Sequence, residues 1–282
     1  MEAIKAYFGS MGFRSVRAAL YAYLFNLFFS LIGYYGFYKL FSGAAGESLS
    51  ARETVGQGGF FSFFSDIIYN YEGGFPLLFS LLALPVILYF LASIFSAGGI
   101  YGVLLGEQKA TFTNLIYTSA ENFFPMFKVF LINLLNWAVA LIFPVGAMVL
   151  YWKPGILEIN EAVWPFFFFI WAVVSVVILI FSTAVYDFSR IYRLEEERNF
   201  LISFKEGIKI TFSNKINVLI LFVCYGISLF ILYLIYLLVS GLLDSLVYTV
   251  IIFLVYQILM LIRCYLKVVL MQAEVKIAAP LE

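Results

Sequence analysis

The stretch INVLILFVCYGISLFILYLIYLLVS, residues 216–240, decides the fold class because it contains no charged residue. A helix needs about 20 consecutive apolar residues to cross the hydrocarbon core of a bilayer. This stretch is long enough, and it therefore predicts a transmembrane helix. Five other segments are also long and predominantly apolar. The six predicted spans are 19–41, 76–97, 124–151, 163–186, 216–240 and 243–262.

The composition of the whole chain agrees with lipid as the surrounding solvent. Of 282 residues, 64% are hydrophobic and 12% are charged, whereas soluble domains are about half apolar and about one quarter charged. Lys plus Arg equals Asp plus Glu, at 17 each, so net charge gives no reason to expect nucleic acid as a partner. We expect an all-α integral membrane protein that forms a single membrane domain over residues 1–282.

The distribution of Lys and Arg predicts the orientation, because basic residues collect on the cytoplasmic side of a membrane protein. Fourteen of the 17 basic residues lie on the side of the termini, and three lie on the other side: Lys39, Arg52 and Lys153. We therefore expect both termini in the cytoplasm. Short turns are expected at 241–244 and at 152–155, where Pro and Gly occur.

The first apolar run could be mistaken for a secretory signal, because basic residues precede it and Gly43, Ala44 and Ala45 follow it. The run is longer than a typical signal core. We therefore expect it to stay in the protein as a membrane helix.

A threefold internal repeat is predicted from short matches before the odd-numbered spans. At an offset of 204 residues, Glu2, Ile4, Lys5 and Phe8 match Glu206, Ile208, Lys209 and Phe212; at an offset of 88, Phe112 and Phe124 match Phe200 and Phe212. We expect three pseudo-repeated hairpins, each preceded by an amphipathic helix on the cytoplasmic side, in units of about 1–107, 108–198 and 199–282. Such parallel repeats imply a pseudo-threefold axis along the membrane normal.

The segment before the fifth span shows the amphipathic pattern best. Phe200, Ile208 and Phe212 recur near helical spacing, and charged residues occupy the other positions. The pattern is typical of a helix that lies in the interface, and a plain connecting helix packed on the bundle is the alternative. The basic residues expected to contact lipid headgroups or partners are Lys5, Arg14, Arg17, Lys205 and Lys209.

The predicted outer segment 42–75 is the longest connection outside the spans. An interfacial helix is one interpretation of its aromatic second half, and a gate or plug over a cavity is the other.

Gly98, Gly102 and Gly106 follow one another at intervals of four residues, which places them on one face of the second membrane helix. Small residues in this pattern let another helix approach closely. Helix packing is the first interpretation, and a hinge at the cytoplasmic end is the second.

Three amides are expected within the spans: Asn133, Asn136 and Gln257. Amides in hydrocarbon need hydrogen-bond partners, which facing helices usually supply. The alternative is a polar substrate path.

Charged residues near the inner ends of the spans include Asp187, Arg263 and Lys267. We expect them at the inner boundary, with the basic side chains extended toward headgroups, or with Asp187 paired to Arg263. The run 190–198 is expected to be a charged, solvated continuation of the fourth helix, or else a docking site for a cytoplasmic partner.

The sequence gives no candidate catalytic, cofactor-binding or metal-binding residues. It contains no His, and Cys224 and Cys264 lie in apolar runs without the spacing of a zinc site. Walker loops and dinucleotide fingerprints are also missing. We therefore expect a protein without enzymatic activity, cofactor or metal.

The pattern Glu–x–Ile–Lys–x–x–Phe at 206–212, followed by a hairpin and repeated, resembles uncharacterised bacterial six-helix membrane proteins related to the YciC-like family and to the membrane domain of some glycerophosphodiester phosphodiesterases. The resemblance implies a bacterial inner-membrane protein and transfers no catalytic residue. We expect a scaffold or accessory subunit that contacts lipids and other membrane proteins or further copies of itself. A transporter for a lipid-like or apolar solute is the alternative, and an enzyme acting on lipids through Asp66 and Glu72 is a third.

Overall fold

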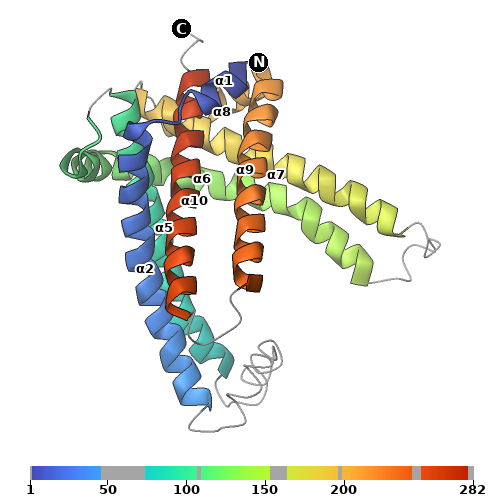
Figure 1. Cartoon of the computed structure of the whole chain (residues 1–282). Coiled ribbons are helices and arrows are strands. Elements are labelled where there is room, and N and C mark those ends of the chain that lie inside the picture. Colours follow the sequence, from blue (N-terminus) through green and yellow to red (C-terminus); the bar gives the residue numbers. More distant parts are fainter. Residues whose placement is uncertain are drawn as a thin grey trace. The chain divides into compact units, whose positions relative to one another are not determined.

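The computed structural model describes residues 2–45, 74–106, 109–152, 164–195, 199–242 and 249–278. These residues form eight helices and no strand (Figure 1). In chain order the helices are α1 (Glu2–Phe8), α2 (Phe13–Ala45), α5 (Gly74–Leu105), α6 (Phe112–Trp152), α7 (Trp164–Glu195), α8 (Phe200–Ser213), α9 (Lys215–Leu242) and α10 (Thr249–Ala278).

Six of these helices are long and apolar enough to cross a membrane: α2, α5, α6, α7, α9 and α10. Their large apolar side chains are widely exposed, and only 11% of the span in α9 is buried inside the protein. In water this much exposed apolar surface would be very unfavourable, whereas lipid tails solvate it. The chain is a helical multi-pass membrane protein, and the predicted fold class is confirmed at this level.

Several helices are longer than the predicted spans. The sixth span was expected to end at residue 262, but α10 continues to Ala278. The fourth helix was expected to continue beyond its span, and α7 does continue to Glu195. Charged side chains do not end a helix, because its backbone hydrogen bonds do not depend on the charge of the side chains. The second amphipathic segment is also not a separate helix, since it forms the first turns of α6, which runs on through Pro125.

The short helix α8 has clear end signals in its sequence. The side chain of Asn199 accepts a hydrogen bond from the backbone N–H of Leu201, and Asn214 closes the other end by donating its N–H to the carbonyl of Ile210. Asn is among the preferred residues at the start of a helix for this reason. These two residues separate α8 from its neighbours α7 and α9.

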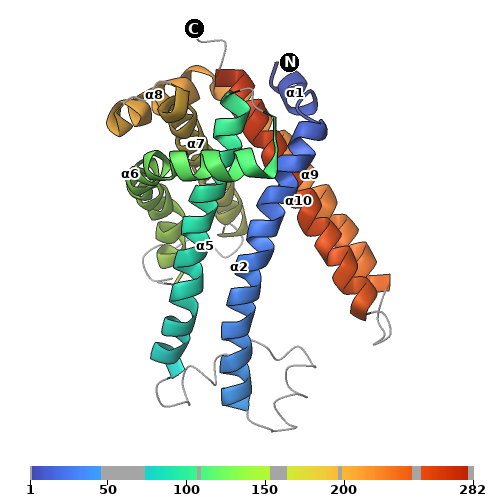
Figure 2. The ribbon, with the colours of Figure 1, turned by 90° about the vertical axis from the view of Figure 1, so that its left-hand side faces the viewer.

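The chain divides into two compact units. Unit 1 combines residues 1–21 with 94–282, and unit 2 spans residues 22–93. Within unit 1, α7 packs against α6 and α8, and α9 packs against α10. Figures 1 and 2 both show α1 beside the C-terminal part of α10.

Most of the predicted outer segment 42–75 lies outside the described residues, and so do residues 153–155 and 243–244 of the two predicted turns. The interpretations of segment 42–75 as an interfacial helix or as a gate therefore stay predictions.

Candidate functional site

A cluster of buried charged side chains lies where the C-terminal parts of α5, α7 and α10 meet in unit 1. Asp187 of α7 is 1% exposed, and its Oδ1 atom lies 3.2 Å from a guanidinium nitrogen of Arg190, one turn further along the helix. Its other oxygen, Oδ2, lies 3.5 Å from Nζ of Lys267 of α10. Asp187 therefore joins two helices through two opposite charges.

A second carboxylate completes the cluster. Glu274 of α10 is 0% exposed, and its Oε2 accepts a 2.7 Å hydrogen bond from the hydroxyl of Tyr101 of α5. Its other oxygen, Oε1, has no hydrogen-bond partner in the part of the chain that the structure describes. The charges of Asp187 and Lys267 both act on this carboxyl group.

Aromatic side chains enclose the basic side of the cluster. The guanidinium group of Arg190 lies 3.6 Å from the ring centre of Tyr186 and also donates a hydrogen bond to its hydroxyl. The Tyr186 ring in turn meets Trp137 of α6 edge-on at 5.2 Å. A guanidinium group gains from such a ring when water is excluded.

The cluster combines acidic and basic side chains. Asp187 and Glu274 are its acidic residues, and Arg190 and Lys267 are its basic residues. Charges inside a membrane protein are costly unless they pair, and paired groups commonly mark a functional or a conformation-fixing site. Asp187 of α7 pairs with Lys267 of α10, and Tyr101 of α5 bonds Glu274 of α10, so the cluster connects these three helices.

The cluster differs from the sequence expectations in three respects. The partners of Asp187 are Arg190 and Lys267, whereas Arg263, which was the alternative partner considered, is exposed on α10. The expected solvated continuation of the fourth helix is wrong for Arg190, which is 8% exposed. Sequence reasoning missed Glu274, although it follows Lys267 by seven residues and therefore shares its face of the helix.

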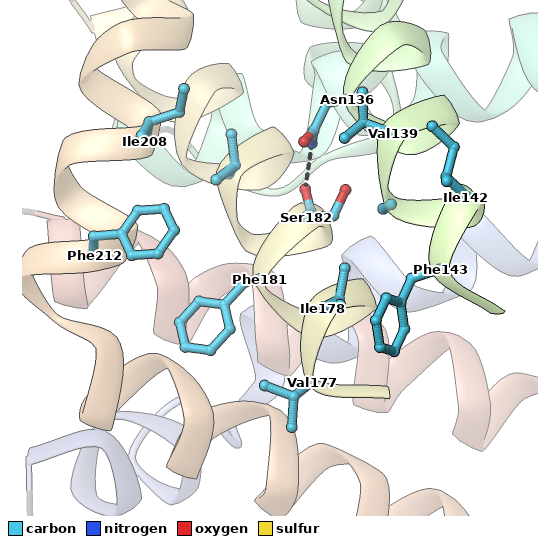
Figure 3. A pocket seen from close by; sticks show the side chains of 12 residues that line it. Asn136, Val139, Ile142, Phe143, Val177, Ile178, Phe181, Ser182, Ile208 and Phe212 are labelled. Carbon is cyan, nitrogen blue, oxygen red and sulfur yellow. Dashed lines mark hydrogen bonds between the residues drawn. The ribbon is translucent and has the colours of Figure 1, made fainter. Parts of the chain in front are cut away.

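An apolar cleft of about 580 Å³ lies between α6, α7 and α8 (Figure 3). One wall is the parallel stack of Phe181 on Phe212, with ring centres 5.7 Å apart. The polar groups in its lining are Asn136 and Ser182. The other lining residues are Val139, Ala140, Ile142, Phe143, Val177, Ile178, Val185 and Ile208.

Two of the three predicted intramembrane amides lie together. Nδ2 of Asn136 donates to the backbone carbonyl of Ser182 at 3.0 Å and to Oδ1 of Asn133 at 2.8 Å. The first of these bonds joins α6 to α7, as expected for amides in hydrocarbon. Gln257 and Asn133 are not among the residues that line the cleft.

The predicted glycines lie where α6 crosses α5. A methyl group on Gly98 would lie 3.3 Å from Cβ of Asn122, and one on Gly102 would lie 2.6 Å from Cγ2 of Thr118. Gly99, which was not predicted, is the tightest, because a methyl group there would overlap the backbone of α6 at Leu115. Gly106 follows the last residue of α5 and donates its N–H to the carbonyl of Gly102.

Three segments, α1, α8 and the first turns of α6, bury a small residue and expose a phenylalanine five residues later. The three small residues Ala3, Ser119 and Gly207 are buried. The phenylalanines are exposed at 57% for Phe8, 69% for Phe124 and 57% for Phe212. In α8 the buried residues are Ser203, Gly207, Ile210 and Thr211, whereas Ile208 and Phe212 are exposed.

The predicted headgroup-contacting residues do not all face outward. Lys5, Arg17, Lys205 and Lys209 are exposed, and Lys209 pairs with Glu206 at 3.3 Å. Arg14 instead donates a 2.5 Å hydrogen bond to the carbonyl of Val103, near the end of α5.

The two cysteines, Cys224 and Cys264, are free thiols and form no disulfide. No protein-family model, no curated protein and no solved structure matches this chain.

Proposed function

We propose that this chain is a non-enzymatic scaffold or accessory subunit of a bacterial inner membrane, where it contacts lipids and partner proteins. The observation that carries the proposal is the exposed phenylalanine that α1, α8 and the first turns of α6 each present. An apolar face that a protein leaves uncovered indicates a lipid or protein contact. Exposed lysines accompany it on α1 and α8, as in helices that lie at a membrane surface.

The matching positions of these phenylalanines also support the threefold repeat. Phe8, Phe124 and Phe212 are separated by the offsets that relate the three sequence matches, and each is exposed in the same way. The chain then consists of three hairpins, each preceded by an amphipathic segment on the cytoplasmic side. This architecture is the one that the resemblance to the YciC-like proteins implies, with both termini in the cytoplasm.

The charged cluster favours a scaffold over an ion pathway. Its two acidic and two basic groups come from α7 and α10, and Tyr101 of α5 donates a hydrogen bond to Glu274. Such an arrangement holds helix ends in one position. A relay would need polar groups that continue across the membrane, and the cleft next to α7 is lined almost wholly by apolar side chains.

Transport of a lipid-like or apolar solute is the second candidate function. The cleft between α6, α7 and α8 favours it, because its volume lies within the range of about 300–1,000 Å³ that is typical of small-molecule sites.

Photo-cross-linking in native membranes tests the proposed role. A photoreactive phenylalanine at position 8, 124 or 212 should give adducts with lipid and with discrete partner proteins. The matched control is Phe253 of α10, which is 58% exposed within a membrane span and should give lipid adducts alone. Adducts with neither lipid nor protein at all three positions would contradict the proposal.

Two further measurements separate the candidates. Purification in mild detergent should recover companion proteins, and a monodisperse chain without companions would count against an accessory subunit. Movement of a fluorescent lipid between the leaflets of vesicles that hold the purified chain would instead favour transport.

A tag fused after Glu282 should be reachable from the cytoplasmic side, and labelling from the opposite side would contradict the orientation.

A further inference from the structure

The cleft between α6, α7 and α8 contains an unusual polar group. Ser182 is 5% exposed and lines the cleft, and its Oγ atom has no hydrogen-bond partner among the described residues. Its backbone carbonyl is held by Asn136, which fixes the position of the residue (Figure 3). A buried hydroxyl without a partner costs free energy, so an acceptor supplied by a ligand would stabilise this site.

The rest of the lining suits a hydrocarbon chain. Ile178, Phe181 and Phe143 extend away from Ser182 along α7 and α6 (Figure 3). These residues belong to helices that can cross the membrane. A hydrocarbon chain alone offers no acceptor to the Ser182 hydroxyl, whereas the ester carbonyl of a glycerolipid does.

The depth of Ser182 agrees with the position of an ester. Ser182 precedes Asp187 by five residues, which is about 7.5 Å along a helix. The charged cluster at Asp187 belongs to the end of α7 that leads directly into α8. Ser182 also lines the same cleft as Ile208 and Phe212 of α8. With α8 at the membrane surface, as proposed above, Ser182 lies close to the boundary between hydrocarbon and headgroups, where the esters of glycerolipids lie.

The charge beside the cleft selects the headgroup. On α8, Lys205 precedes the lining residue Ile208 by three positions, and Lys209 precedes the lining residue Phe212 by three. Residues three apart are neighbours on a helix surface, and both lysines are exposed. Glu206 neutralises part of the charge of Lys209, which leaves Lys205 as the main contact for a phosphate.

We infer that this cleft binds one acyl chain of an anionic glycerophospholipid, with an ester carbonyl at the Ser182 hydroxyl and the headgroup beside Lys205 and Lys209. The inference rests on the proposed lipid-contacting role and names the lipid and its site.

Native mass spectrometry of the full chain tests the inference. The detergent-purified protein receives equal amounts of phosphatidylglycerol and phosphatidylethanolamine with the same acyl chains. The wild type should retain one phosphatidylglycerol in preference. Val177→Trp fills the cleft and should reduce retention on the order of tenfold, whereas Val176→Trp, on an exposed position of α7 outside the lining, should leave it unchanged.

Two conservative changes keep the test valid if the tryptophan disturbs folding. Ser182→Ala should weaken retention by about 2- to 10-fold through the lost hydrogen bond. The double change Lys205→Gln and Lys209→Gln should reduce the preference for phosphatidylglycerol at least about fivefold, while a lipid is still retained.

The inference would be overturned if the Val176→Trp and Val177→Trp proteins retained equal amounts of lipid, or if Ser182→Ala retained as much as the wild type. Either result would mean that the retained lipid only surrounds the protein and does not occupy the cleft. The proposed function is tested separately, because cross-links at Phe8 and Phe124 do not involve the cleft. Loss of those cross-links would remove the proposed function, whereas retention that is independent of the cleft would remove only this site.

Discussion

Replacing Asp187 by Asn should destabilise the protein more than any change of a single surface charge. Asn has nearly the same size, so the change removes the charge and leaves the packing intact. The side chains of Asp187 and Arg190 are 2% and 9% exposed, and breaking a buried pair by removing one partner costs about 3–5 kcal/mol. We expect a loss near about 3 kcal/mol, because Arg190 keeps Tyr186 and the Lys267 side chain is 41% exposed.

Reversible unfolding in mixed micelles of increasing dodecyl sulfate content, followed by tryptophan fluorescence, measures this loss. Adding Arg190→Gln to Asp187→Asn should recover most of it, because neutral groups then replace both charges. The control is Glu206→Gln, which breaks the exposed pair with Lys209 and should cost below about 0.5 kcal/mol. The reasoning is refuted if Asp187→Asn and Glu206→Gln have the same stability.

Three further changes test other parts of the structure by the same unfolding measurement. Tyr101→Phe removes the hydrogen bond to Glu274 and should cost about 1–3 kcal/mol; an unchanged stability would mean that this bond contributes nothing. Gly99→Ala should cost about 1–3 kcal/mol, because the added methyl group overlaps the α6 backbone. Gly226→Ala has open space around it and should be neutral or stabilising by up to about 1 kcal/mol. Equal effects of the two changes would contradict the close crossing of α5 and α6. Burial raises the pKa of Tyr7 above its usual value of 10.0, so its contribution is complete below pH 10 and is lost as the pH rises further. The stability of Tyr7→Phe should therefore fall less than that of the wild type above pH 10, and parallel pH profiles would argue against a buried Tyr7.

The membrane class could be predicted from the sequence because it depends on local composition. A run such as 216–240 contains no charge, and its length alone decides that it can span a bilayer. The glycines of α5 could also be placed on a packed face, because a spacing of four residues keeps Gly98 and Gly102 on one side of a helix.

The charged cluster could not be predicted when the sixth span was ended before Arg263. That choice left Glu274 outside the helix, although α10 continues past it. Arg190 was expected in a solvated continuation of the fourth helix, but it is buried. The spacing of seven residues between Lys267 and Glu274 was the available signal. The cleft had no signal of this kind, since its volume depends on how side chains of three helices meet.

The faces of α8 were also only partly predictable. Phe200, Ile208 and Phe212 were expected to form one apolar face, and the structure exposes Ile208 and Phe212. It buries Ser203, Gly207, Ile210 and Thr211. The apolar pattern did not indicate which residues pack on the bundle, because close helix approach in lipid favours small residues such as Ser203 and Gly207.

The contact between α1 and α10 has a consequence for the order of events during synthesis. Lys276 donates a 2.9 Å hydrogen bond to the carbonyl of Gly9, and Ser15 donates one of 2.7 Å to Gln272. At ribosomal speeds of about 5–20 residues per second, α1 emerges on the order of tens of seconds before its partner exists. The hydroxyl of Tyr7 in α1 also bonds Ser228 of α9. A chain cut short before α9 therefore leaves α1 without either of the helices it packs on, which offers quality-control proteases a direct means of recognising an unfinished product.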